Sequence, residues 1–69
     1  MEVPKIIQNA LEMRTKHAER FNHYDYIVSN WLDKNNISVE SFDTHGGTES
    51  IVNPKESQKR ILNAIRNKK

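Results

Sequence analysis

The 69-residue chain has no cysteine, and it has only two glycines and two prolines. Without cysteine it forms neither a disulfide nor a thiolate metal site, the two supports on which small domains often depend. Apolar residues are also scarce, since they make up 35% of the chain. A domain of this size buries only about 60% of its unfolded surface. We therefore expect association, either as a homo-oligomer or with a stable partner, to supplement a thin core.

Long apolar runs are absent as well. No stretch approaches the roughly 18 residues that a membrane span requires. The start of the chain, residues 1–5, lacks the apolar region of a signal peptide. We therefore expect a cytoplasmic protein with no membrane partner.

Residues suited to catalysis or metal binding are few and poorly spaced. His17 and His23 are six residues apart, so they fall on different faces of a helix, and His45 belongs to a turn. A helical metal pair needs a spacing of three or four residues. Asp25 and Asp33 are eight residues apart on the same predicted helix, too far to share a proton. We predict a non-enzymatic protein with no metal site and no cofactor.

What the chain does have is an uneven distribution of charge. The net charge is +2, but residues 22–52 carry −4 and residues 53–69 carry +5. A basic terminal segment suits either a polyanion or the acidic face of a neighbouring subunit, and on nucleic acid it would contact phosphates without reading sequence. An ordinary solvated helix face is the alternative. The residues predicted to bind DNA or another polyanion are Lys55, Lys59, Arg60, Arg66, Lys68 and Lys69.

The first predicted element is a long helix over about residues 3–34, where apolar residues recur at spacings of three and four. Asn35 and Asn36 suit its end, because asparagine tolerates the left-handed backbone conformation found there. Arg14 is one of two charged residues that interrupt an apolar row and so argue against a coiled-coil seam. One continuous helix is expected, with a break near residues 22–23 as the alternative.

The second predicted element is a two-stranded β-hairpin over about residues 37–52. Apolar and polar residues alternate over 37–41, as in a half-buried strand. Residues 48–52 are rich in β-branched side chains, which favour a second strand. Gly46 and Gly47 lie between the two strands and allow the positive φ that a tight turn needs.

The last predicted element is a helix over about residues 54–67. Asn53 can cap its N-terminus, and Pro54 fits the first helical position, where a missing N–H costs nothing. Glu56 stands three residues after Asn53, the spacing of a capping box. The apolar stripe of this helix consists of Ile61, Leu62 and Ile65.

These elements predict one small α+β domain over residues 1–69: a long N-terminal helix, a two-stranded β-hairpin and a basic C-terminal helix. We expect all three to share one core. The residues expected in that core or in a subunit interface are Ile7, Leu11, Phe21, Tyr24, Val28, Trp31, Leu32, Ile37, Val39, Ile51, Ile61, Leu62 and Ile65.

Three aromatic residues of the long helix are candidates for a subunit or partner interface. Phe21 and Trp31 share helical spacing with the apolar stripe, so burial in the core is their alternative role. Tyr26 points away from that stripe and is the better interface candidate.

The order of these elements resembles the C-terminal region of phage terminase small subunits. The resemblance is carried by residues 26–37, by residues 46–54 with their Gly-Gly and Asn-Pro pairs, and by the final apolar helix; it covers roughly residues 24–66. It implies an oligomer that is not itself an enzyme and that takes part in DNA packaging inside the host cell. The implied partners are double-stranded DNA and the large terminase subunit, which carries the ATPase and nuclease.

A second function stays open beside this one. The chain is short, its middle is acidic and Tyr26 is expected at the surface. These features suit a small phage- or prophage-encoded module that binds a host or phage protein and inhibits or regulates it.

Overall fold

The computed structural model describes residues 1–68, apart from the side chain of Ala18, and all its regular elements are helical. No strand occurs among the described residues, so the predicted α+β fold with a β-hairpin is wrong. The elements are α1 (Lys5–Lys16), η1 (Ala18–Arg20), α2 (Phe21–Lys34), η2 (Ser41–Asp43), α3 (Thr48–Val52) and α4 (Pro54–Arg66).

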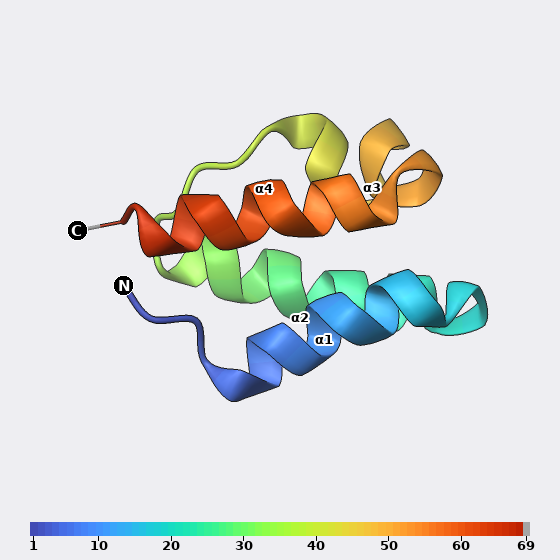
Figure 1. The fold of residues 1–69 in the computed structure, drawn as a ribbon, viewed down its shortest axis with the longest axis horizontal. Helices are drawn as coiled ribbons and strands as arrows, with labels where there is room; N and C mark the ends of the chain where they lie inside the picture. The colour runs from blue at the N-terminus through green and yellow to red at the C-terminus, as the bar shows by residue number, and fades with distance from the viewer. Residues whose placement is uncertain (69) are drawn as a thin grey trace.

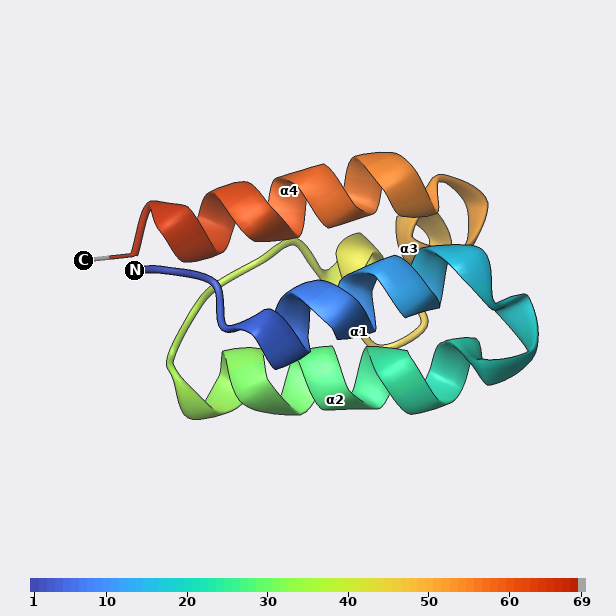
Figure 2. The same cartoon turned by 60° about the horizontal axis from the view of Figure 1, so that its bottom comes forward.

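The three long helices α1, α2 and α4 form the body of the molecule. Helices α1 and α2 run antiparallel to each other, and α4 packs along α1 (Figure 2). The two termini lie at the same end of the body (Figure 1). The α1–α2 connection and the short helix α3 lie together at the other end (Figure 1).

The long helix predicted over residues 3–34 is two helices. Helix α1 ends at Lys16, and the single turn η1 leads into α2 at Phe21. The break covers residues 17–20, just before the alternative position at 22–23. Folding back at this point buries Ile7 and Leu11 of α1 against the apolar face of α2. A single continuous helix of the same sequence would leave its apolar stripe exposed to water, so tertiary packing favours the break.

The end of α2 matches the sequence prediction. Asn36 has a φ of 54°, the left-handed conformation expected after a helix C-terminus. The N–H of Ile37 donates to the carbonyl of Leu32 at 3.0 Å, and the N–H of Asn36 donates to that of Asp33 at 3.2 Å. These two bonds form a Schellman motif, which turns the chain and brings Ile37 back onto the core.

Residues 48–52, predicted as a strand, form helix α3 instead. Ser50 is fully buried and its Oγ donates to the carbonyl of Gly47 at 2.7 Å. Ile51 and Val52 are 60% and 66% exposed, so the β-branched pair that favoured a strand does not enter the core. Strand propensity is a weak preference that depends on packing partners, and here the segment is a helix that buries Ser50 and exposes the β-branched pair.

The two glycines still form a turn, but it connects η2 to α3 rather than two strands. Gly46 has a φ of +72°, as predicted, and its N–H donates to Asp25 Oδ2 at 2.8 Å. Gly47 has a φ of −63°, which any residue can adopt, so glycine is needed there for lack of space and not for its backbone conformation. A Cβ on Gly47 would lie 2.5 Å from the carbonyl oxygen of Phe42.

The predicted C-terminal helix is present as α4, with Pro54 in its first turn. Asn53 occupies the N-cap position, but its side chain makes no capping bond and instead donates to Glu49 Oε2 at 3.2 Å. Glu56 forms no capping box either; its Oε1 lies 3.9 Å from Lys59 Nζ. The capping prediction was therefore correct in position and wrong in chemistry.

Seven of the residues predicted in the core are fully buried, and they come from α1, α2, α4 and the segment after α2. They are Ile7, Leu11, Val28, Leu32, Ile37, Ile61 and Ile65. Tyr24, Trp31, Val39 and Leu62 are half-buried and pack against them. Ile51 was expected in the core or in a subunit interface; it is 60% exposed on α3, so it lies outside the core.

Candidate functional site

Arg14 lies at the centre of the fold, although the sequence indicated only an interrupted apolar row. Arg14 as a whole is only 1% exposed. Nη1 donates to Asp25 Oδ1 at 3.0 Å and to the backbone carbonyl of Asp43 at 2.9 Å, while Nη2 donates to Ser57 Oγ at 2.9 Å. This guanidinium therefore connects α1 to α2, η2 and α4.

A second ion pair extends this network to the surface. Asp43 is 1% exposed and accepts hydrogen bonds from Arg60 at 2.8 and 2.9 Å. Arg60 also donates to Glu49 Oε2 at 3.2 Å and lies over the ring of Phe42. The hydrogen bonds from Arg60 lower the pKa of Asp43, and those bonds raise the pKa of Arg60 in turn. The guanidinium that was predicted to contact DNA is thus engaged within the protein.

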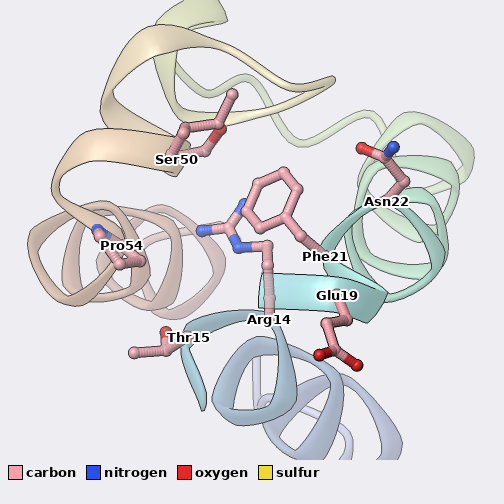
Figure 3. A pocket seen from close by; sticks show the side chains of 8 residues that line it. Arg14, Thr15, Glu19, Phe21, Asn22, Ser50 and Pro54 are labelled. Carbon is pink, nitrogen blue, oxygen red and sulfur yellow. The ribbon is translucent and has the colours of Figure 1, made fainter. Parts of the chain in front are cut away.

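A pocket of about 290 Å³ opens beside Arg14 at the end of the body where α3 lies. We call it the Arg14 pocket. Figure 3 shows the Arg14 guanidinium between Phe21, Ser50 and Pro54, with Glu19 and Asn22 at the side. The pocket is lined by Arg14, Thr15, Glu19, Phe21, Asn22, Ser50, Ile51 and Pro54.

One polar atom of this pocket has no hydrogen-bond partner among residues 1–68. It is Arg14 Nε, which is buried. The ring of Phe21 lies over the same guanidinium, 5.7 Å from its central carbon, and is half-buried. Buried side-chain donors are nearly always paired, so an unpaired donor on a residue that lines the pocket is a candidate contact for a ligand.

The basic residues of α4 divide into two groups. Lys55 and Lys59 line a groove of about 420 Å³ between α1 and α4, and Lys16 of α1 joins them there. We call this groove, with its three lysines, the lysine groove. Glu12 is the one acidic residue among the groove's lining residues. Sequence reasoning missed Lys16, because nothing in the chain order indicates that the end of α1 meets the start of α4.

The other predicted cations lie elsewhere. Arg66 is exposed near the end of α4, and Lys68 Nζ donates to the carbonyl of Asn36 at 3.0 Å. Lys69 lies outside the described residues. Arg60 faces Asp43 and Glu49, as described above. Of the five predicted cations that the structure describes, Lys55 and Lys59 therefore share one groove, whereas Arg60 and Lys68 contact groups of the protein itself.

The three predicted interface aromatics differ in exposure. Tyr26 is 70% exposed on α2. Trp31 is half-buried against the core, and Phe21 is half-buried in the wall of the Arg14 pocket. Tyr26 therefore presents a large free aromatic surface, while the other two have packing roles within the domain.

The histidines do not converge on a metal site. Among the described residues, no group of three or more histidine, cysteine, aspartate or glutamate side chains is placed to hold a metal ion. His45 instead lies beside Asp33, with 3.5 Å between Nε2 and Oδ2, and both side chains are exposed. Within residues 1–68, the helices are all too short or too polar to cross a membrane.

Comparison of the chain with models of known protein families, with curated proteins and with solved structures found no match.

Proposed function

We propose that this protein is a non-enzymatic, DNA-associated protein that contacts phosphates through the lysine groove. The supporting observation is that Lys16, Lys55 and Lys59, from two different helices, line one groove. Lys59 is 75% exposed at its side chain and Lys16 and Lys55 are also exposed, so their ammonium groups are available to a large ligand. Lysines gathered in one groove can neutralise phosphates without contacting base edges.

The proposed biological setting is phage DNA packaging, in an oligomer that works with a large terminase subunit. This part of the proposal rests on the sequence resemblance over residues 24–66. The β-hairpin no longer supports it, because residues 48–52 are helical. DNA contact is the part that the geometry supports best.

Binding to a fluorescent 25-base-pair duplex at a series of salt concentrations tests the proposal. Each neutralised phosphate contributes about 0.9 to the slope of log affinity against log salt. The triple variant K16Q/K55Q/K59Q should therefore have a slope flatter by about 2.7. Light scattering on the same samples reports whether the binding species is an oligomer.

The matched control is K34Q, which removes one exposed lysine at the end of α2, away from the groove. Its slope should equal that of the wild type, because a lysine that contacts no phosphate adds nothing to the slope. Equal slopes for the wild type and the triple variant would remove the lysine groove as the contact surface. A wild-type slope of zero would remove DNA binding altogether.

A second candidate function is a protein-binding module that inhibits or regulates a host or phage protein. Three exposed apolar residues favour it, namely Tyr26 on α2 and the adjacent pair Ile51 and Val52 on α3. Ile51 also lines the Arg14 pocket. Exposed apolar side chains beside a pocket are typical of protein-contact surfaces.

A further inference from the structure

The Arg14 pocket contains a hydrogen-bond donor that the protein leaves unused. Arg14 is 1% exposed, and both of its terminal nitrogens have acceptors. Its Nε has none among residues 1–68. A buried donor without an acceptor costs free energy, and an incoming oxygen atom removes that cost.

The charge around this donor favours a neutral oxygen over an anion. The Asp25 carboxylate already balances the guanidinium at 3.0 Å. Glu19 also lines the pocket, but its carboxylate points away from the guanidinium (Figure 3). A second anion on Arg14 would lie near the Asp25 carboxylate, so it would be repelled. An amide or peptide carbonyl accepts the same hydrogen bond without that penalty.

The size and surroundings of the pocket favour a polypeptide as the source of this carbonyl. A volume of about 290 Å³ is at the lower end for small-molecule sites and suits one large side chain. Ile51 lines the pocket and is 60% exposed, and Val52, which is 66% exposed, continues the apolar surface outside it. An occupant that covers both residues extends beyond the pocket, as a peptide segment does.

We propose that the Arg14 pocket docks a segment of a partner polypeptide. One apolar side chain of the partner packs against Phe21, Ile51 and Pro54, and one backbone carbonyl accepts a hydrogen bond from Arg14 Nε–H. The ring of Phe21, which lies over the guanidinium, moves to admit that carbonyl. This inference rests on the second candidate function, protein binding, and is independent of DNA contact.

A blocked amino acid, N-acetyl-leucine N-methylamide, reproduces the proposed chemistry in its smallest form. Titrated into the ¹⁵N-labelled full chain, it should shift the Arg14 Nε–H resonance and the backbone amides of Ser50 and Ile51. The expected dissociation constant is of millimolar order, as for other fragments of this size. The blocked glycine analogue, which has no side chain, should bind at least tenfold more weakly.

The variant I51Q removes an apolar wall of the pocket at an exposed position and should weaken fragment binding about tenfold. Its matched control is I6Q, which makes the same change on α1 at a residue that is 67% exposed and outside the pocket lining. Binding to I6Q should equal binding to the wild type.

Several results would overturn the proposal. Absence of any shift at 50 mM fragment means that water alone fills the pocket. Tighter binding of N-acetyl-leucine, which carries a free carboxylate, means an anion site instead of a carbonyl site. Shifts of pocket amides without a shift of Arg14 Nε–H mean an apolar cavity that makes no use of the donor.

A pull-down from bacterial lysate separates failure of the pocket from failure of the protein-binding function. Recovery of the same stoichiometric partner by the wild type and by I51Q means that protein binding stands but uses another surface, such as Tyr26. Fragment binding without recovery of any partner means that the pocket chemistry stands while the protein-binding function does not. Loss of the partner with I51Q but not with I6Q supports both.

Discussion

Arg60 donates two parallel hydrogen bonds to the carboxylate of Asp43, from Nε to Oδ2 at 2.8 Å and from Nη2 to Oδ1 at 2.9 Å. Asp43 is almost completely buried, whereas the side chain of Arg60 is 41% exposed. This fork geometry is specific to arginine and carboxylate, and lysine does not reproduce it. The pair joins the segment after α2 to α4, so Arg60 stabilises the fold.

The first prediction concerns pH. Arg60 lowers the pKa of Asp43 below its ordinary value of 3.8, so the native state binds a proton less readily than the unfolded state. The stability contributed by this pair is therefore present above about pH 4 and is lost as pH falls through the native pKa. The variant D43N should have a lower melting temperature than the wild type at pH 7, and the difference should shrink below pH 4. Thermal unfolding followed by circular dichroism from pH 7 to pH 2 checks this. A difference that stays constant over that range would contradict it.

The second prediction concerns the buried pair of Arg14 and Asp25. Replacing Arg14 alone leaves the Asp25 carboxylate buried without its partner, so R14M should cost about 3–5 kcal/mol, enough to unfold much of so small a domain. Neutralising both residues removes the unpaired charge. R14M/D25N should therefore be more stable than R14M in urea unfolding. The control K16M, on the exposed side of α1, should change stability by less than about 0.5 kcal/mol. A double variant less stable than R14M would show that the ion pair is not the source of the loss.

This ion pair was partly visible in the sequence. Arg14 and Asp25 interrupt the same apolar row, seven residues after Ile7 and three before Val28. They argue against a coiled-coil seam, but two opposite charges on helices that pack against each other also predict a buried pair. That inference needs the break after Lys16, which local propensity does not indicate. The end of α2 before Asn36 and the start of α4 at Pro54 were predictable, because both follow from local backbone chemistry.

The part of the fold that sequence reasoning missed lies where local preference and packing disagree. Thr48, Ile51 and Val52 favour a strand by propensity, but Ser50 is buried and the segment is helical. The pairing of Lys16 with Lys55 in one groove, and the formation of the Arg14 pocket, both follow from this tertiary arrangement. No pattern along the chain places these residues together, so the candidate sites could not be predicted from the sequence.

The third prediction separates the two glycines. A Cβ on Gly47 would lie 2.5 Å from the backbone of Phe42, so G47A must displace the chain between η2 and α3. Gly46 has positive φ, but nothing lies within 4 Å of a Cβ built there. G46A should therefore cost only about 1–2 kcal/mol from backbone strain, and G47A should cost clearly more. Urea unfolding of the two variants gives the comparison. Equal losses of stability would contradict the close approach of Gly47 to Phe42.

The fourth prediction tests the helical fold against the hairpin that the sequence suggested. In the hairpin both Ile51 and Ile61 would be core residues, whereas in the structure Ile61 is fully buried and Ile51 is 60% exposed. I61A should cost about 2–5 kcal/mol, the usual range for a buried isoleucine. I51A should change stability by about 0.5 kcal/mol or less, because its side chain is already largely in water. Both changes remove the same atoms from the same residue type, so each variant serves as the control for the other in urea unfolding. A loss for I51A as large as that for I61A would mean that α3 is packed into the core and that the Arg14 pocket is closed by Ile51.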